Sequence, residues 1–345
     1  MVHTLTRVLM LSMLLQISIQ TSTSEGEQSP TVLFPVSSEN GALSKVGFID
    51  SKGKLVIAFS FYAADEFSEG LAQVTFVRDG KQGYIDTLGR TVIEPQFDWA
   101  FPFRESRAKV RINRKWGYID PTGKIIVEAK FDEADSFYEG LARVKLDGKW
   151  GYIDRSGKLV IPFQFEGANR FSEGLACVLK NDRLGYISKL GQWVITPRFE
   201  PIPSPTDALF ISNFSEGLAV IKKGNQYGYI NKVGAVAILT YFDRAEGFSE
   251  GLASVTVDKK AGYLNRSGAL IIPPQFDAAR RFSEGLAEVE VGDKWGYIDH
   301  AGKVIIEPQF DTVSSFRNGL AQVGCGRTSG YIDHEYKYVW KTNGG

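Results

Sequence analysis

Two histidines, His300 and His334, are the only imidazoles beyond residue 24, so they are the first candidates for acid–base chemistry. Each follows directly after an aspartate, in a stretch with the composition of an exposed turn. No serine or cysteine forms a nucleophile–base arrangement with them, and two cysteines, Cys177 and Cys325, are too few for a zinc site. The residue types therefore predict surface histidines, no enzyme activity, and no cofactor or metal.

Carboxylates are numerous, but most of them recur at the same place in successive units of the chain. One acidic or amide position is filled by Asp50, Asp86, Asp120, Asp154, Ser188, Asn231, Asn265, Asp299 and Asp333. Glycine follows three residues later in eight of these nine places, which is the preference of a type I turn. A calcium role is the alternative, although the spacing matches neither the EF-hand loop nor the calcium-binding nonapeptide repeat. The glutamates of a recurring EGLA element, such as Glu139 and Glu284, are likewise predicted to be turn or strand-entry residues.

Positive charge gathers where one unit departs from the others and reads FRESRA instead of FSEGLA. Alternation along the following strand would place its basic side chains on one face and Ala108 and Val110 on the other. The candidate binding residues of this basic strip are Arg104, Arg107, Lys109, Arg111, Arg143 and Lys145. An ordinary solvated face, a site for an anionic partner, and self-association with the acidic positions Glu288 and Glu290 are the three interpretations.

A second departure is an insertion around residues 200–212, which is rich in proline and then apolar. Inserted loops on a regular scaffold often carry recognition, so Pro203, Leu209 and Phe210 are further candidate binding residues. A harmless insertion is the competing interpretation.

The elements that would position these residues form a tandem repeat. A strand-like motif with a central glycine recurs at Gly47, Gly83, Gly117, Gly151, Gly185, Gly228, Gly262, Gly296 and Gly330. Six of the eight steps between these glycines are 34 residues. The unit that starts at Glu139 contains an alternating strand, an Asp147-Gly148 hairpin signal, a second strand, and a third strand over 159–161 that Pro162 is expected to end. Glycine inside a strand indicates a bulge or a close approach by a neighbouring backbone.

Such a unit is a three-stranded meander that cannot bury its own apolar face, so neighbouring units must stack. A Phe-Asp-x-x-x-x-Phe connection, as at Phe131 and Phe137, is expected to fill the seams. The predicted fold is therefore all-β, a tandem array of about nine meanders of roughly 34 residues. Because propellers usually have four to eight blades of four strands, an open twisted array is favoured, with a closed propeller-like ring as the alternative.

The motifs themselves resemble those of the WG-repeat family, also called KWG repeats. The resemblance rests on GKWGYIDRSGK at 148–158, PQFD at 95–98 and 308–311, and FSEGLA at 171–176 and 282–287, and it extends over about residues 40–340. It implies a mostly bacterial group without a shared enzymatic activity and with a role in interactions. The namesake tryptophan is kept only at Trp116, Trp150 and Trp295, which argues against a continuous tryptophan ladder for a ligand.

The N-terminus has the pattern of an export signal. Arg7 precedes an apolar run from Val8 to Ile19, and the small residues Ser22 and Ser24 follow. The predicted division is a signal peptide over 1–24, a leader over 25–39, the repeat array over 40–340 and a tail over 341–345. An uncleaved membrane anchor and a buried N-terminal helix are the alternatives. No disulfide is expected between Cys177 and Cys325.

Charge and composition restrict the partners. Forty basic residues balance forty acidic ones, so no overall field attracts nucleic acid or a membrane. We expect an exported, non-catalytic scaffold that binds a protein or an anionic glycan and is periplasmic, cell-surface or secreted, without stable membrane insertion after cleavage. The alternative is a cell-envelope carbohydrate-binding module in which Trp116, Trp150 and Tyr152 stack on sugar rings.

Overall fold

Every regular element of the computed structural model is a β-strand, as the sequence predicts, within the residues that it describes: 32–38, 44–202 and 212–342. Val32–Gly345 forms one compact unit. No helix in these ranges is long and apolar enough to cross a membrane. The predicted signal peptide lies outside the described residues.

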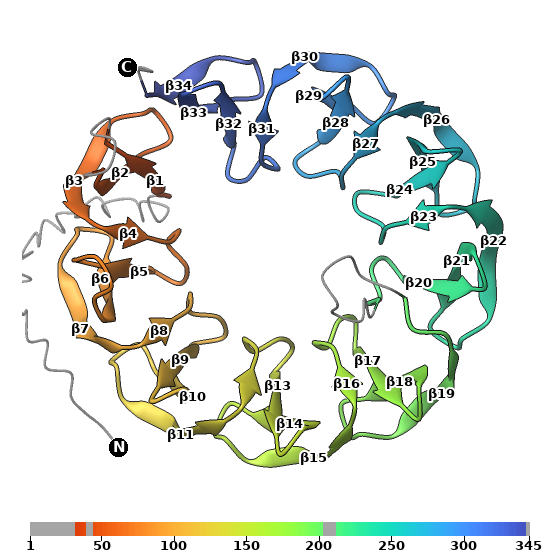
Figure 1. The fold of residues 1–345 in the computed structure, drawn as a ribbon, viewed down its shortest axis with the longest axis horizontal. Helices are drawn as coiled ribbons and strands as arrows, with labels where there is room; N and C mark the ends of the chain where they lie inside the picture. Colours follow the sequence, from red (N-terminus) through yellow and green to blue (C-terminus); the bar gives the residue numbers. More distant parts are fainter. Residues whose placement is uncertain (1–31, 39–43, 203–211, 343–345) are drawn as a thin grey trace, which may run out of the picture. The chain divides into compact units, whose positions relative to one another are not determined.

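The strands form nine antiparallel sheets, which we call blades 1 to 9 in chain order. Each blade carries an outer strand at one edge, and Figure 1 shows these strands at the periphery. The outer strands are β3 (Leu55–Phe61), β7 (Thr91–Phe97), β11 (Ile125–Phe131), β15 (Leu159–Phe165), β19 (Trp193–Phe199), β22 (Val236–Phe242), β26 (Leu270–Phe276), β30 (Val304–Phe310) and β34 (Tyr338–Lys341). The third strands pair with them and are β2 (Val46–Ile49), β6 (Gln82–Asp86), β10 (Lys115–Ile119), β14 (Lys149–Asp154), β18 (Arg183–Ser188), β21 (Gln226–Asn231), β25 (Lys260–Asn265), β29 (Lys294–Ile298) and β33 (Thr328–Ile332).

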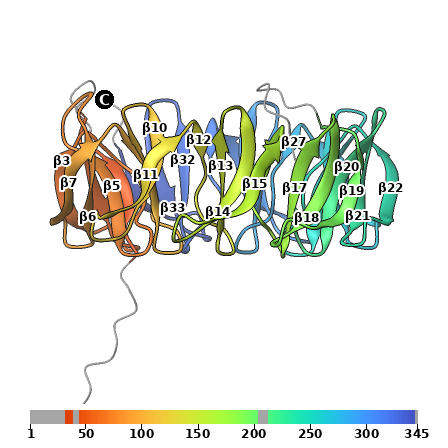
Figure 2. The ribbon, with the colours of Figure 1, turned by 90° about the horizontal axis from the view of Figure 1, so that it is seen from below.

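The inner half of each blade consists of a second strand and, in seven blades, a short inner strand of two residues. The second strands are β1 (Phe34–Ser37), β5 (Leu71–Thr75), β9 (Ala108–Ile112), β13 (Leu141–Leu146), β17 (Leu175–Lys180), β20 (Leu218–Lys223), β24 (Leu252–Val257), β28 (Ala287–Val291) and β32 (Ala321–Cys325). The inner strands are β4 (Ala63–Ala64), β8 (Trp99–Ala100), β12 (Glu133–Ala134), β16 (Gly167–Ala168), β23 (Arg244–Ala245), β27 (Ala278–Ala279) and β31 (Thr312–Val313). In Figure 2 the strands run between the two faces of the ring.

Two predicted strand features need correction and one is confirmed. Pro162 was expected to end a strand, but that strand, β15, continues through the proline to Phe165. It can do so because β15 lies at the edge of its sheet, where the backbone N–H that proline lacks is not needed for pairing. Phe34–Ser37, placed in the leader, is the second strand of blade 1. The strand glycine does mark a close backbone approach, since a Cβ on Gly151 would lie 2.7 Å from the Ile161 carbonyl oxygen.

The blades close into a ring. In each seam an aromatic ring of the third strand packs against a phenylalanine from the next blade, for example Tyr118 against Phe137 at 4.9 Å. The same contact joins the last blade to the first, where Tyr331 lies 5.4 Å from Phe34 and donates a hydrogen bond to the Pro35 carbonyl oxygen at 3.1 Å. The favoured open array is therefore wrong and the ring is the observed arrangement. Closure buries apolar end faces that an open array would expose to water.

Candidate functional site

The inner turns are the loops that join each inner strand to its second strand, and Figure 1 shows them pointing toward the middle of the ring. We define them as residues 65–70, 101–107, 135–140, 169–174, 246–251, 280–286 and 314–320, with 212–217 as the described part of the turn in blade 6. They carry the large side chains Arg104, Tyr138 and Arg317 at a position where five other blades have serine, so they form the candidate site.

The EGLA glutamates fasten one inner turn to the next. Glu139 has a φ of 54°, in the left-handed region. Its carboxylate accepts a hydrogen bond from the Gly174 amide at 3.0 Å and forms an ion pair with Lys189 at 3.1 Å. The hydrogen bond from a glycine amide of the next turn recurs at Glu105, Glu173, Glu216, Glu250 and Glu284. The prediction that these glutamates are structural turn residues is thus confirmed.

The two histidines occupy the position of Lys189 in later blades. His300 stacks on Phe282 with ring centroids 4.2 Å apart and lies 3.2 Å from the Glu250 carboxylate, while its side chain is 42% exposed. His334 is placed in the same way against Phe316 and Glu284. They are surface residues that join neighbouring blades, as predicted.

The acidic turn residues are also explained by local structure. Asp120 accepts hydrogen bonds from the Thr122 and Lys124 amides at 3.0 and 3.1 Å, as a turn of this type requires. A hydrogen bond from the Thr122 hydroxyl lowers the pKa of Asp120. Across the described ranges, no group of three or more His, Cys, Asp or Glu side chains could hold a metal ion. Both cysteines are free thiols, with Cys177 buried and Cys325 exposed.

One position of the inner turns distinguishes blades from one another. In five blades a serine donates a hydrogen bond to a phenylalanine carbonyl oxygen in the next blade, namely Ser68, Ser172, Ser215, Ser249 and Ser283. Arg104, Tyr138 and Arg317 stand at this position in blades 3, 4 and 9. At these three places the turn carries a large side chain instead of a small one.

Arg104 and Tyr138 form a stack together with Arg170. The Cζ atoms of Arg104 and Arg170 lie 4.4 and 4.3 Å from the centroid of the Tyr138 ring. Within the described part of the chain neither guanidinium group makes a hydrogen bond or ion pair, so the ring orients both while their N–H groups remain available. Arg104 was predicted from the sequence, but Tyr138 and Arg170 were not, although Tyr138 stands where five other blades have serine.

Arg170 also lines a cavity of about 260 Å³ next to this stack. The lining residues are Asn169, Arg170, Ser172, Ser212, Asn213, Phe214, Ser215, Gly247 and Arg281, from the inner turns of blades 5 to 8. Arg281 is partly neutralised by Glu246 at 3.7 Å. The side-chain oxygen of Asn213 is buried and has no hydrogen-bond partner in the described chain.

The predicted basic strip is not a single exposed face. Lys109 and Arg143 turn into the seams between blades, where both approach Asp135, at 3.9 and 3.1 Å. Only 13% of the Lys109 side chain is exposed, burial lowers its pKa, and its Nζ donates to the Ala134 carbonyl oxygen at 3.1 Å. The reason is that neighbouring blades cover both faces of a second strand, so alternation does not leave one face to solvent.

The remaining strip residues lie apart from one another. Arg107 donates to the Arg155 carbonyl oxygen at 2.9 Å, and Lys145 pairs with Glu133 at 2.7 Å. Arg111 is half-buried, with its guanidinium carbon 5.7 Å from the Trp116 ring centroid. Pro203, Leu209 and Phe210 lie outside the described residues.

Comparisons with known proteins agree with this architecture. A family model described as WG containing repeat matches residues 47–76, 83–116, 116–150, 150–183, 185–206, 210–227, 227–260, 262–295 and 295–326. No curated protein matches the chain.

Among solved structures, the chain is similar to a crystal structure of the eukaryotic initiation factor, at 10% identity and a TM-score of 0.62, over 90% of this chain and 96% of that one. Weaker similarity is found to Hsv2p from Kluyveromyces lactis, at 9% identity, a TM-score of 0.43, and 66% and 89% coverage. Virginiamycin B lyase from Staphylococcus aureus is 15% identical with a TM-score of 0.36, over 79% and 97%. At such identities the first similarity shows the propeller fold alone.

Proposed function

The chain belongs to the WG containing repeat family, and from that premise we propose that it is an exported, non-catalytic scaffold whose inner turns bind anionic groups of a protein or glycan. The observation that carries the proposal is the stack of Arg104 and Arg170 on Tyr138. Two guanidinium groups held by one ring lose little freedom on binding a carboxylate, sulfate or phosphate.

The neighbouring cavity extends the same chemistry. Arg281, on the lining of that cavity, supplies a third guanidinium group. Planar guanidinium groups recognise oxyanions through paired hydrogen bonds, which are stronger than bonds between neutral groups. The stack and the cavity together form what we call the arginine arc, defined by Arg104, Tyr138, Arg170 and Arg281.

A non-catalytic role is supported by the use of the recurring polar residues. The turn aspartates, the glutamates and both histidines are engaged in contacts that build the ring. Export is supported by the charged, apolar and small-residue order of 1–24.

The carbohydrate-stacking alternative has less support. Tyr152 is buried and Trp150 is 8% exposed, both within one core cluster. Trp116 packs against Phe101 with ring centroids 5.7 Å apart. A sugar ring would have to displace core contacts in order to stack on these side chains.

Heparin affinity chromatography tests the proposal, with heparin as the anionic probe. Changing Arg104, Arg170 and Arg281 to Gln together should weaken binding about tenfold or more at 0.1 M salt, because charge-assisted hydrogen bonds are lost. The matched control changes Lys124, Lys158 and Lys303 to Gln, three exposed lysines at or next to the start of outer strands.

We expect the arginine variant to elute at clearly lower salt and the lysine variant to elute close to the unmodified protein. Equal shifts in the eluting salt concentration for the two variants would mean that heparin binds through nonspecific charge and not through the arginine arc. No retention of the unmodified protein at low salt would rule out the anionic partner.

A further inference from the structure

The seam between blades 9 and 1 is built differently from the other seams. Elsewhere in the described chain, apart from the interrupted segment before blade 6, a connection runs from an outer strand to the next inner strand and then through an inner turn. Blade 1 has no inner strand among the described residues, which begin at residue 32. Tyr331 is 6% exposed, whereas Tyr118 and Tyr297 in other seams are 0% exposed.

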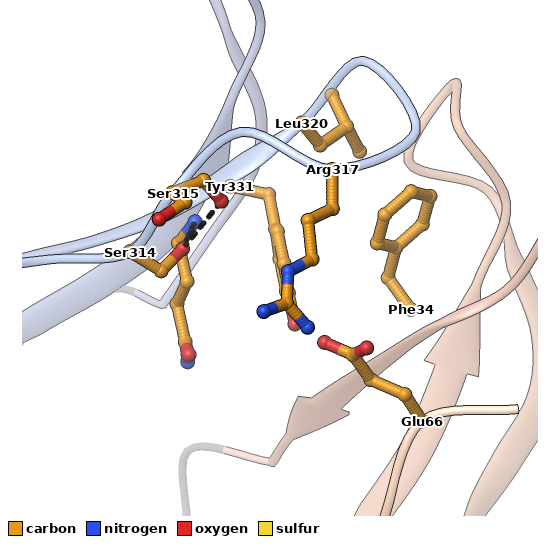
Figure 3. Close-up of a pocket in the computed structure, with 8 residues that line it drawn as sticks. Phe34, Glu66, Ser314, Ser315, Arg317, Leu320 and Tyr331 are labelled. Carbon is orange, nitrogen blue, oxygen red and sulfur yellow. Dashed lines mark hydrogen bonds between the residues drawn. The ribbon is translucent and has the colours of Figure 1, made fainter. Parts of the chain in front are cut away.

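A cavity of about 260 Å³ lies at this seam and is shown in Figure 3. We call it the closure pocket, and it is lined by Phe34, Glu66, Ser314, Ser315, Arg317, Leu320, Gln322 and Tyr331. Ligand pockets for drug-sized molecules measure about 300–1,000 Å³. The closure pocket is therefore suited to a smaller molecule.

Two opposite charges face one another in the closure pocket. Arg317 takes the position at which five other blades have a serine, and its guanidinium group points toward the Glu66 carboxylate in Figure 3. Within the described part of the chain the two side chains form no ion pair with each other and hydrogen-bond to no other residue. Both are exposed and come from blades 9 and 2.

The rest of the lining combines apolar side chains with the polar residues Ser314, Ser315 and Gln322. Phe34 and Leu320 are buried at 5% and 4% exposure and supply the apolar wall. The Ser314 hydroxyl accepts a hydrogen bond from the Gln322 amide at 2.8 Å. The pocket thus has one positive, one negative and one apolar part.

We propose that the closure pocket binds a small zwitterion, an α-amino acid with an apolar side chain. Its carboxylate would pair with Arg317, its ammonium group with Glu66, and its side chain would lie over the small parts of Phe34 and Leu320 that remain exposed, without displacing their core contacts. A purely anionic ligand would bring its charge beside Glu66, and a purely cationic one would bring its charge beside Arg317. This site is separate from the arginine arc, so the two proposals can fail independently.

Isothermal titration calorimetry of the purified chain with L-leucine tests the proposal. Isocaproate, which lacks the ammonium group, and isoamylamine, which lacks the carboxylate, are matched probes of similar size. We expect saturable binding of leucine and at least tenfold weaker binding of either probe. Equal affinity for leucine and one of the probes would overturn the zwitterion assignment.

Variants then place the ligand. Arg317→Ser installs the residue that five other blades carry, so it should fold, and Glu66→Gln keeps the size of the side chain. Each should weaken leucine binding at least tenfold, while Arg266→Ser, which removes an exposed arginine of blade 7, should leave it unchanged.

Failure has two forms, and both can be recognised. Absence of leucine binding at millimolar concentration would overturn the proposal outright. Unchanged binding in Arg317→Ser would place leucine elsewhere, and heparin retention measured in parallel would report on the arginine arc separately.

Discussion

The second-strand position opposite the buried tyrosine shows how a single residue adapts to a seam. Lys109 donates a hydrogen bond to the Ala134 carbonyl oxygen at 3.1 Å, and Ser254 donates to the Ala279 carbonyl oxygen at 3.1 Å. Each acceptor lies 25 residues further along, in the next blade. In these two blades the position is therefore filled by a side chain that donates a hydrogen bond across the seam.

Glu288 occupies this position in blade 8 and does not fit it. The residue is 0% exposed, and neither carboxylate oxygen has a hydrogen-bond partner in the described chain. Glu288→Gln, the residue type of Gln73 and Gln322 at this position, should raise the free energy of unfolding by about 1–3 kcal/mol, the usual cost of an unsatisfied buried polar group. Urea denaturation measures this change in the free energy of unfolding, and Glu290→Gln, at a half-buried position, is the control. A loss of stability in Glu288→Gln would contradict the prediction, because it would mean that the carboxylate has a partner.

Lys109 was expected on an exposed face but lies in a seam between blades. As a solvated residue it could be replaced without effect, since exposed charges contribute little. In the seam, Lys109→Ala should lower the free energy of unfolding by about 1–3 kcal/mol, because the Ala134 carbonyl oxygen loses its donor and Asp135 loses an ion-pair partner. Thermal denaturation would detect it, and Arg114→Ala, at an exposed hairpin tip, should leave the melting temperature unchanged.

At the scale of elements, the sequence predicted the second and third strands and the hairpin between them, because alternation and turn residues are local signals. It missed the inner strands, since two residues have no period, and it ended β15 at Pro162 because it could not identify an edge strand. It also assumed one solvated face, whereas all five residues of β5 are buried. Burial on both faces depends on where the next blade packs, and the sequence of a single unit does not determine that position.

The hairpin tips predict how stability depends on pH. Asp132 lies 2.6 Å from Lys115 and accepts a hydrogen bond from the Asp147 amide of the next blade at 3.0 Å, and its hydrogen bond with Lys115 lowers its pKa. Asp277 has the same arrangement with Lys260 and Gly292, and its pKa is also lowered. A lowered pKa in the folded state stabilises the fold above the ordinary aspartate value of 3.8 and loses that effect as pH falls through the lower value.

The melting temperature should therefore change little between pH 7 and about 5 and fall increasingly below about pH 4. Asp132→Asn should make this acid-induced fall shallower. A melting temperature that rises as pH falls below 4 would contradict the linkage. Calorimetry across this range measures it.

The strand glycines are the tightest points between a third strand and its outer strand. Gly151→Ala should destabilise by about 1–3 kcal/mol, since the added Cβ would lie 2.7 Å from a backbone oxygen that belongs to β15 and cannot move alone. Gly247→Ala is the control, because its new Cβ would meet only the guanidinium group of Arg281, at 3.1 Å, which can turn away. Similar changes in melting temperature for the two variants would show that the β15 backbone can move away from the added Cβ at little cost.

For the whole molecule, the decision between open array and ring rests on the two end blades. Nine blades in a row would leave the apolar face of blade 1 and that of blade 9 in water, and each would need capping residues that the repeats do not supply. The ends instead make the aromatic contact that every other pair of blades makes, with Phe34 as the phenylalanine. As in the other seams that have a tyrosine, the tyrosine hydroxyl donates to a carbonyl oxygen of the next blade, here that of Pro35. The sequence could not settle this point, because curvature is the sum of small rotations between blades.

Replacing Tyr331, in the seam between blades 9 and 1, tests whether the ring is closed. In an open array, Tyr331 would be a terminal residue without a partner, and its replacement would cost little. In the ring, Tyr331→Ala removes a nearly buried aromatic ring and a hydrogen bond to Pro35, so the free energy of unfolding should fall by about 3 kcal/mol. Tyr118→Ala, in an interior seam, is the matched variant and should cost at least as much, because Tyr118 is fully buried. Urea denaturation of both variants compares the seams: a Tyr331→Ala protein as stable as the unmodified chain would mean that the ring is open in solution.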